Sequence, residues 1–210
     1  MPPFDQSTYQ VRLEWGVAGL ARLAPADIVV VVDVLRFSTT VIEAVDRGED
    51  YPLDAAAHAV SPGGAPVARA AARTGALVLL GCLRNASAVA AAVLEEQERR
   101  GARTNIAVIA AGELSGRDAV TLRFAVEDQL GAGAIIGALG ALGLDHSSPD
   151  AAVAAESFRA LRRAVKHLLT ASGSGRELIE TGRGDAVARA AAVDAASVVP
   201  VLRDGVFRAM

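Results

Sequence analysis

Residues 28–35 read IVVVVDVL, a short run of β-branched and other apolar side chains interrupted by one aspartate. A continuous apolar run of this length is typical of a strand that is buried on both faces of a parallel sheet. The runs at 76–82 (ALVLLGC) and 106–110 (IAVIA) are of the same type. The run at 198–202 (VVPVL) predicts a fourth strand near a sheet edge, because its central proline cannot donate a backbone hydrogen bond. The alternating stretch 11–15 (VRLEW) predicts a further edge strand.

Helical patterns separate these runs. The clearest one covers residues 86–100, with apolar side chains on one face and charged residues at its end. A segment rich in proline and glycine, 51–65, predicts a loop. Strands that alternate with helices predict an α/β fold with a largely parallel central sheet, covered by helices on both faces, in a single domain over residues 1–210. The other expected helices are 39–47, 65–73, 126–142, 149–169, 175–181 and 185–195.

Composition and charge exclude several classes of protein. With 52% hydrophobic residues and a net charge of −3, the 210-residue chain is not intrinsically disordered, and a general basic field for nucleic acid is absent. No apolar run approaches the roughly 20 residues of a membrane span, and the first residues do not form a secretory signal. Cys82 is the only cysteine, so it forms no internal disulfide or zinc site. We therefore expect a cytoplasmic protein that binds neither membrane nor nucleic acid, and the apolar composition is compatible with a homodimer.

Two predicted strands end in similar segments, 33–40 (DVLRFSTT) and 81–87 (GCLRNAS). Each holds Leu-Arg, then a residue suited to capping a helix, then hydroxyl groups. A helix N-terminus beside an arginine is suited to binding phosphate, sulfonate or carboxylate groups. The alternative is that both segments are ordinary helix caps with arginines paired to surface acids. The candidate anion-binding residues are Arg36, Ser38, Thr39, Arg84, Asn85 and Ser87.

Acidic side chains form the second set of candidates. Asp33 ends a buried run, where a carboxylate is costly unless it has a partner or a metal ion. It could hold Mg²⁺ or attack phosphorus, or it could cap a helix or bind Arg36. Glu127 and Asp128 precede a glycine-rich run, 131–137; they could join a metal site or complement the dipole of a helix. That glycine run lacks the spacing of a dinucleotide fingerprint and is more typical of close helix packing, so a nucleotide-binding oxidoreductase is the weakest alternative.

Four blocks of sequence resemble a known family. They are VVVVDVLRFSTTVIEAV from Val29, GCLRNASAVAAA from Gly81, AVEDQLGAGAII from Ala125, and a C-terminal set that includes SGSGRELIETG and VVPVLRDGVFRA. The sequence is similar to the 2-phosphosulfolactate phosphatases, or ComB-like proteins. This resemblance implies a three-layer α/β/α fold and Mg²⁺-dependent hydrolysis of 2-phosphosulfolactate to 3-sulfolactate and phosphate, a step towards coenzyme M. That substrate carries three anionic groups, which agrees with two anion-binding strand ends.

The chain departs from the family pattern between the first and second blocks. The segment before Gly81 is shorter than in the family, with Gly63 where the family has asparagine and Ala65 where it has a hydroxyl residue. A non-catalytic relative that binds anions is therefore the main alternative to a phosphatase. The resemblance and the residues together predict a catalytic centre of Asp33, Arg36 and Arg84 in one cleft, with the role of Asp33 as metal ligand, nucleophile or base left open. The substrate-binding candidates are Ser38, Thr39, Asn85, Ser87, Gly63 and Gly64, and the Mg²⁺ candidates are Asp33, Glu127 and Asp128.

Overall fold

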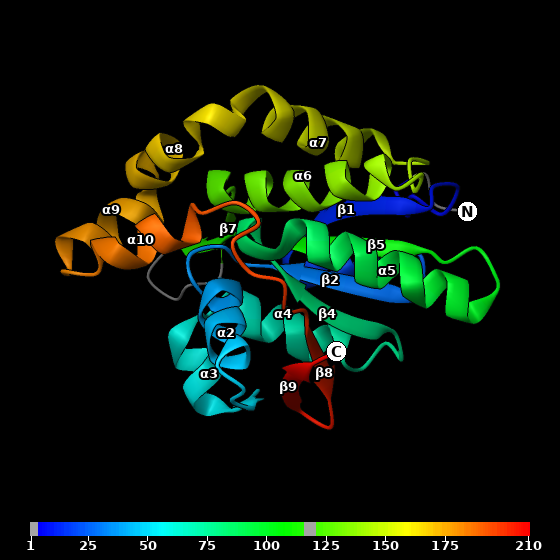
Figure 1. Cartoon of the computed structure of the whole chain (residues 1–210), viewed down its shortest axis with the longest axis horizontal. Coiled ribbons are helices and arrows are strands. Elements are labelled where there is room, and N and C mark those ends of the chain that lie inside the picture. Colours follow the sequence, from blue (N-terminus) through cyan, green and yellow to red (C-terminus); the bar gives the residue numbers. More distant parts are fainter. Residues whose placement is uncertain (1–3, 116–120) are drawn as a thin grey trace.

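The structure is a computed structural model that describes residues 4–115 and 121–210 (Figure 1). Within these residues, seven strands form one sheet in the order β1-β5-β2-β4-β8-β9-β3. The first four of these strands run parallel to one another, and β8, β9 and β3 join the sheet antiparallel. The strands are β1 (Val11–Trp15), β2 (Ile28–Val32), β3 (Tyr51–Pro52), β4 (Leu77–Gly81), β5 (Ile106–Ala110), β8 (Pro200–Arg203) and β9 (Val206–Ala209), and β6 (Glu113–Ser115) pairs with β7 (Thr121–Arg123) in a separate ribbon.

Helices cover both faces of this sheet, which confirms the predicted three-layer α/β/α fold (Figure 1). In the described part of the chain, no helix has both the length and the apolar composition needed to cross a bilayer. The helices are α1 (Gly16–Arg22), α2 (Phe37–Asp46), α3 (Ala55–Val60), α4 (Gly64–Ala71), α5 (Ala86–Arg100), α6 (Val126–Ala141), α7 (Pro149–Leu161), α8 (Val165–Ala171), α9 (Gly173–Glu180) and α10 (Gly184–Ala190), with short 3-10 turns η1 (Leu83–Asn85) and η2 (Arg162–Ala164).

Strand β2 lies at the centre of the hydrophobic core, and its five residues are all buried. Because successive side chains of a strand point to opposite faces, the run of valines serves two layers at once. Ile28, Val30 and Val32 belong to the cluster that includes side chains of α5 and α6. Val29 and Val31 belong to the cluster that includes side chains of α2 and α4. This double burial explains why the strand needs a continuous apolar run.

Two sequence-based predictions about the elements are wrong in detail. Pro200 lies in β8, which is between β4 and β9 and not at the edge. It is the first residue of that strand, a position where a missing N–H disrupts little of the ladder. Residues 51–65, expected to be a loop, contain β3 and the short helix α3, whose start is capped by the Asp54 side chain. The alanine-rich sequence of this segment favours a helix once that cap is present.

The glycine-rich run in α6 serves close packing, as its spacing indicates. A Cβ atom on Gly131 would lie 2.6 Å from Val34 Cγ2, and one on Gly133 would lie 2.1 Å from the backbone oxygen of Ala154 in α7. Both distances are far below ordinary contact, so α6 approaches the sheet on one side and α7 on the other only because these residues lack side chains. Gly131 and Gly133 are therefore explained by close packing, as the spacing of the run predicts.

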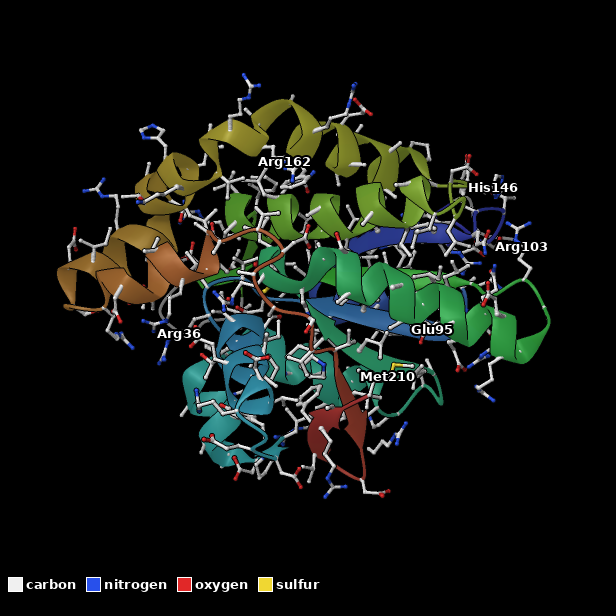
Figure 2. All side chains as sticks on the ribbon, viewed as in Figure 1. Arg36, Glu95, Arg103, His146, Arg162 and Met210 are labelled. Atoms are coloured by element: carbon white, nitrogen blue, oxygen red, sulfur yellow. The ribbon has the colours of Figure 1, made fainter. Side chains whose placement is uncertain are left out.

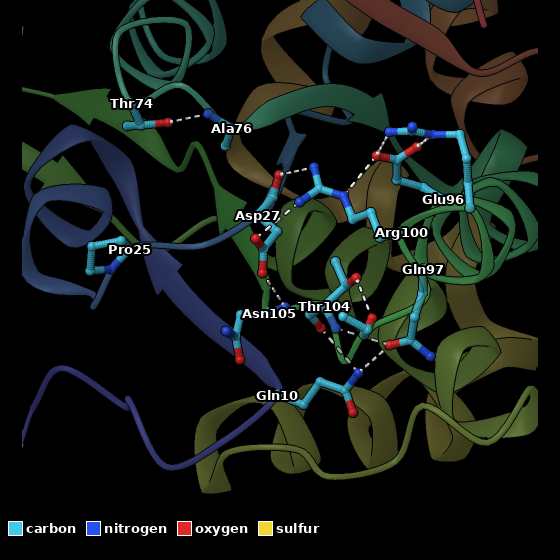
Figure 3. A network of polar contacts seen from close by, with 12 residues as sticks. Gln10, Pro25, Asp27, Thr74, Ala76, Glu96, Gln97, Arg100, Thr104 and Asn105 are labelled. Atoms are coloured by element: carbon cyan, nitrogen blue, oxygen red, sulfur yellow. Dashed lines mark hydrogen bonds and ion pairs between the residues drawn. The ribbon is translucent and has the colours of Figure 1, made fainter.

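Charged residues at the amino ends of the strands are paired with one another (Figure 3). Arg100 donates to Asp27, just before β2, over 3.0 Å and to Glu96 over 2.7 Å. Asp27 also accepts the backbone N–H of Asn105 over 2.8 Å. Arg99 donates to Glu96 as well, and together the two arginines lower the pKa of this carboxyl to about 2. The acidic and basic side chains at this end of the sheet therefore neutralise one another, and their contacts connect α5 to the start of β2.

Candidate functional site

Asp33 lies directly after β2, at the carboxyl end of the sheet, where ligands bind in open α/β folds. Its side chain is fixed by three donors. The backbone N–H of Phe37 lies 3.1 Å from Oδ1, the N–H of Gly64 lies 2.9 Å from Oδ2, and the Ser61 hydroxyl also donates to Oδ2. Its own N–H donates to Ser38 Oγ over 2.9 Å. The carboxylate is buried and cannot rotate without breaking these bonds.

The turn between α3 and α4 supplies two of these donors. Ser61 Oγ accepts the N–H groups of Gly63 and Gly64 over 3.1 and 2.7 Å while its proton points to Asp33. Sequence reasoning singled out both glycines as substrate-binding residues, but it missed Ser61. The sequence signal was the string Ser-Pro-Gly-Gly, since a serine before a tight turn commonly bonds the backbone two or three residues later. The N–H groups of the glycines hold this hydroxyl, and that of Gly64 also bonds Asp33.

Glu127 and Asp128 occupy the first turn of α6 and are both buried, with 3% of each residue exposed. Asp128 accepts the N–H of Val34 over 2.7 Å and that of Gly112 over 2.9 Å, so it joins the ends of β2 and β5. Gly112 is a second residue that the sequence did not single out. Among the residues the structure describes, none donates a hydrogen bond to the carboxylate of Glu127. Glu127 therefore differs from Asp33 and Asp128, whose carboxylates both accept hydrogen bonds from described residues.

These acids share one cavity of about 350 Å³. Arg36 lines it, as the sequence predicts, and Figure 2 shows this residue at the end of the molecule formed by α2, α9 and α10. In the described part of the chain, neither Arg36 nor any other cation forms an ion pair with Asp33, Glu127 or Asp128. The lining also includes residues of the α3–α4 turn, the segment after β5, and the α9–α10 region: Ser61, Pro62, Gly63, Gly112, Glu113, Ser174, Glu177, Leu178 and Arg183.

Burial and the repulsion between neighbouring acids determine the electrostatics of the cavity. Burial raises the pKa of Asp33, and the charge of Glu127 adds to the effect, while the bonds from Ser61, Phe37 and Gly64 oppose it. Burial also raises the pKa of Asp128 well above its usual value, and the negative charges of Asp33 and Glu127 raise it further. Like charges that share a buried site favour a bound proton or a bound cation. The cavity is therefore built to attract positive charge.

The end of β4 does not take part in this cavity. Arg84 Nη1 donates to the backbone oxygen of Arg189 over 2.7 Å, and its buried Nε has no partner among the described residues. The expectation that Arg84 shares a cleft with Asp33 and Arg36 does not hold. The reason is a long-range one: the chain after α10 covers this strand end, with the N–H of Asp194 bonded to the oxygen of Leu83.

The other predicted anion-binding side chains make internal contacts. Asn85 accepts the N–H of Cys82 over 2.9 Å and donates to the oxygen of Val198 over 3.1 Å. Ser87 donates to Asp194 over 2.9 Å. At the end of β2, the Thr39 hydroxyl donates to the oxygen of Val34 over 2.9 Å, and Ser38 bonds Asp33 as described. Of these, only Ser38 supports the cavity, through the backbone of Asp33.

Comparison with known families places the chain in one of them. A family model described as 2-phosphosulpholactate phosphatase matches residues 60–205 of the 210. The chain belongs to this family. Its members are phosphoric monoester hydrolases, and the matched span contains Ser61, Asp128 and Arg183 of the cavity. Asp33 and Arg36 lie before the matched span, on the block that begins at Val29.

The donor set of this cavity can be compared with the needs of Mg²⁺. Its three carboxylates present oxygen atoms, the type of donor that Mg²⁺ prefers. No group of three or more acid, histidine or cysteine side chains in the described residues is arranged to hold an ion by itself. Mg²⁺ usually binds through one or two carboxylates, retained waters and substrate phosphate. The carboxylate of Glu127, which accepts no hydrogen bond from a described residue, fits that mode and does not fit a closed protein cage.

Proposed function

We propose that this protein hydrolyses a small phosphate monoester that carries further acidic groups, with the Asp33 cavity as its active site. The family match supports 2-phosphosulfolactate as the substrate in this proposal, with 3-sulfolactate and phosphate as the products. The observation that carries the proposal is the placement of three buried carboxylates, none in an ion pair with a described residue, in one cavity with Arg36. A phosphate ester binds at such a place when its charge is matched by a cation and an arginine.

Mg²⁺ is the cation that we propose for this site. Glu127 would hold it with its carboxylate, and Asp33 and Asp128 line the same cavity. When bound, the ion would neutralise phosphoryl oxygens and thereby lower the barrier to attack at phosphorus. The raised pKa values of Asp33 and Asp128 support this proposal, since a cation offsets the burial and repulsion that raise them.

The residues of this chain supply positioning. Arg36 would bind phosphoryl oxygens through its planar guanidinium group, which presents parallel donors. Ser61 and Gly64 hold Asp33 in one orientation toward the cavity, which matters because phosphoryl transfer depends mostly on positioning and charge neutralisation. The short turn between α3 and α4 thus furnishes a hydroxyl group, although Gly63 and Ala65 replace the polar residues of the family pattern.

Phosphate release from 2-phosphosulfolactate tests this proposal. The wild-type protein should release phosphate in the presence of Mg²⁺, lose this activity in EDTA, and recover it when Mg²⁺ is restored. Asp33→Asn should lower kcat at least about 100-fold, since loss of a positioned charged group costs several kcal/mol at an active site. Asp46→Asn, at an exposed position on α2, is the matched control and should be fully active.

The outcomes separate the alternatives. Full activity in EDTA would overturn the assignment of Mg²⁺, and full activity of Asp33→Asn would overturn the assignment of Asp33. Tight binding of 3-sulfolactate by calorimetry, with no phosphate release from the ester, would instead identify a non-catalytic protein that binds anions.

A further inference from the structure

The cavity has a second arginine that the strand-end motifs do not account for. Arg183 lines it from the connection between α9 and α10, far in the sequence from Arg36. Within the described residues Arg183 forms no ion pair, although Glu177 of α9 lines the same cavity. In the part of the chain that the structure describes, its guanidinium group bonds only the hydroxyl of Thr181, which lies 3.3 Å from both Nε and Nη2. Arg183 therefore has donors available for a ligand.

Two other arginines near this end of the molecule, both outside the cavity lining, are paired. Arg123 donates to Glu113 over 2.8 Å. Arg189, on α10, pairs with Glu43 over 2.9 Å and also with Asp185. These contacts show that acids are available to nearby arginines. The lack of such a partner at Arg183 is thus a local feature of the cavity wall.

The backbone places Arg183 at a defined point. Helix α9 ends with the N–H of Gly182 bonded to the oxygen of Ile179 and the N–H of Arg183 bonded to that of Leu178. Gly182 has a φ of +77°, a conformation that glycine adopts without strain. This is the Schellman arrangement, in which the residue after the glycine is held against the last turn of the helix. Arg183 occupies that residue, so its side chain starts from a fixed position beside Leu178.

The residues at the two ends of the cavity differ in solvent exposure. Asp33 and Asp128 are 5% and 3% exposed, whereas Arg183 is exposed to solvent. Arg36 is partly exposed, so the two acids lie deepest in the cavity and Arg183 lies at its mouth. A substrate whose phosphate group reaches the acids would present its other end to Arg183.

We infer that Arg183 binds a second acidic group of the substrate, a sulfonate or carboxylate, and so selects phosphate esters that carry one. This inference rests on the proposed function. Arginine is suited to the task because its fork of donors matches both groups. The two arginines then have different roles: Arg36 binds the phosphate group of any ester, and Arg183 binds the second acidic group of the substrate.

The role of Arg183 can be tested by measuring the binding of two ligands and the hydrolysis of two substrates. Arg183→Gln should weaken calorimetric binding of 3-sulfolactate about 10- to 100-fold, the range for loss of a charged hydrogen-bonding partner, and should change binding of inorganic phosphate less than about 2-fold. It should lower kcat/KM for 2-phosphosulfolactate by a similar factor, with little change for para-nitrophenyl phosphate, which has no second acidic group. Arg183→Lys, which keeps the charge, should lie between wild type and Arg183→Gln.

Arg176→Gln is the matched control, because Arg176 is an exposed arginine of α9 that is outside the cavity lining and near Glu180. It should behave as wild type. Unchanged sulfolactate binding in Arg183→Gln, or equal losses for both substrates, would overturn the assignment. A wild-type protein that binds 3-sulfolactate without hydrolysing its phosphate ester would refute the proposed activity, while the binding comparison would still decide the role of Arg183. Wild-type protein that binds neither 3-sulfolactate nor phosphate would overturn both.

Discussion

Replacing Gly64 by alanine perturbs the site in a way that the structure makes quantitative. Gly64 is the first residue of α4, a position where alanine is ordinarily the better helix former. A Cβ atom there would lie 2.5 Å from Asp33 Oδ2, 2.8 Å from Asp33 Cβ and 2.9 Å from Phe37 Cδ1. Ordinary contacts between carbon atoms are about 3.5–4.0 Å, so the added methyl group overlaps its neighbours by about 1 Å.

The neighbours of Gly64 cannot retreat cheaply. Phe37 is fully buried, and the Asp33 carboxylate is held by three hydrogen bonds, one of them from Gly64 itself. Overpacking of this type costs about 1–3 kcal/mol, and the gain in helix propensity returns at most about 1 kcal/mol. We expect Gly64→Ala to lower the free energy of unfolding by about 1–2 kcal/mol. Because Asp33 must shift by a large part of 1 Å, kcat/KM should fall about 100-fold.

Chemical denaturation and phosphate release measure these two effects. The matched control is Gly137→Ala in α6, where no atom lies within 4 Å of the added Cβ. That variant should be more stable than wild type by about 1 kcal/mol and fully active. If Gly64→Ala is as stable and as active as Gly137→Ala, the contact between Gly64 and Asp33 does not position the carboxylate, and the reasoning is refuted.

Two further predictions concern the hydrogen bonds at the two ends of the sheet. Ser61→Ala removes the hydroxyl that orients Asp33, so kcat for phosphate release should fall about 10-fold with little change in KM. Ser61→Thr, which keeps a hydroxyl group, should restore most of the lost kcat. An unchanged kcat in Ser61→Ala would contradict the positioning role of Ser61. Glu96→Gln should destabilise the protein by about 1–2 kcal/mol at pH 7, measured by denaturation, without loss of activity. Because Arg99 and Arg100 lower the pKa of folded Glu96 from 4.5 to about 2, its stabilisation is complete above pH 4.5 and is lost as pH falls toward 2, so the gap between wild type and variant should narrow over that range. If the stability difference between wild type and Glu96→Gln stays constant as pH falls, the ion pair of Glu96 is not its cause.

Local sequence patterns predicted the centre of the fold well. The expected bounds of the strand at 106–110 and the helix at 86–100 coincide with β5 and α5. Continuous valine and isoleucine runs are specific for strands buried on both faces, and this specificity also placed Asp33 at a carboxyl strand end. The acids Glu127 and Asp128 were predicted as partners of Asp33, and the structure lines the same cavity with all three.

The arginines show where local patterns are insufficient. The segments around Arg36 and Arg84 look alike in sequence, yet only Arg36 lines the cavity. The difference arises from residues more than 100 positions later, where the chain after α10 crosses the end of β4. The second arginine that lines the cavity is instead Arg183. Its sequence signal, a glycine and an arginine after a short helix, is informative only when the structure shows that this helix ends at the cavity. Contacts of this range depend on tertiary packing, which a local pattern does not encode.

The two ends of the sheet handle buried charge in opposite ways, and this contrast supports the location of the site. At the amino ends, Glu96 and Asp27 are matched by Arg99 and Arg100 (Figure 3). At the carboxyl ends, three acids are buried without an ion pair among the described residues, and burial and mutual repulsion raise the pKa values of two of them. Paired charges, as at the amino ends, stabilise a fold, whereas buried acids without an ion pair, as at the carboxyl ends, destabilise it. This unmatched negative charge supports the proposal that a cation binds in the cavity together with the anionic substrate.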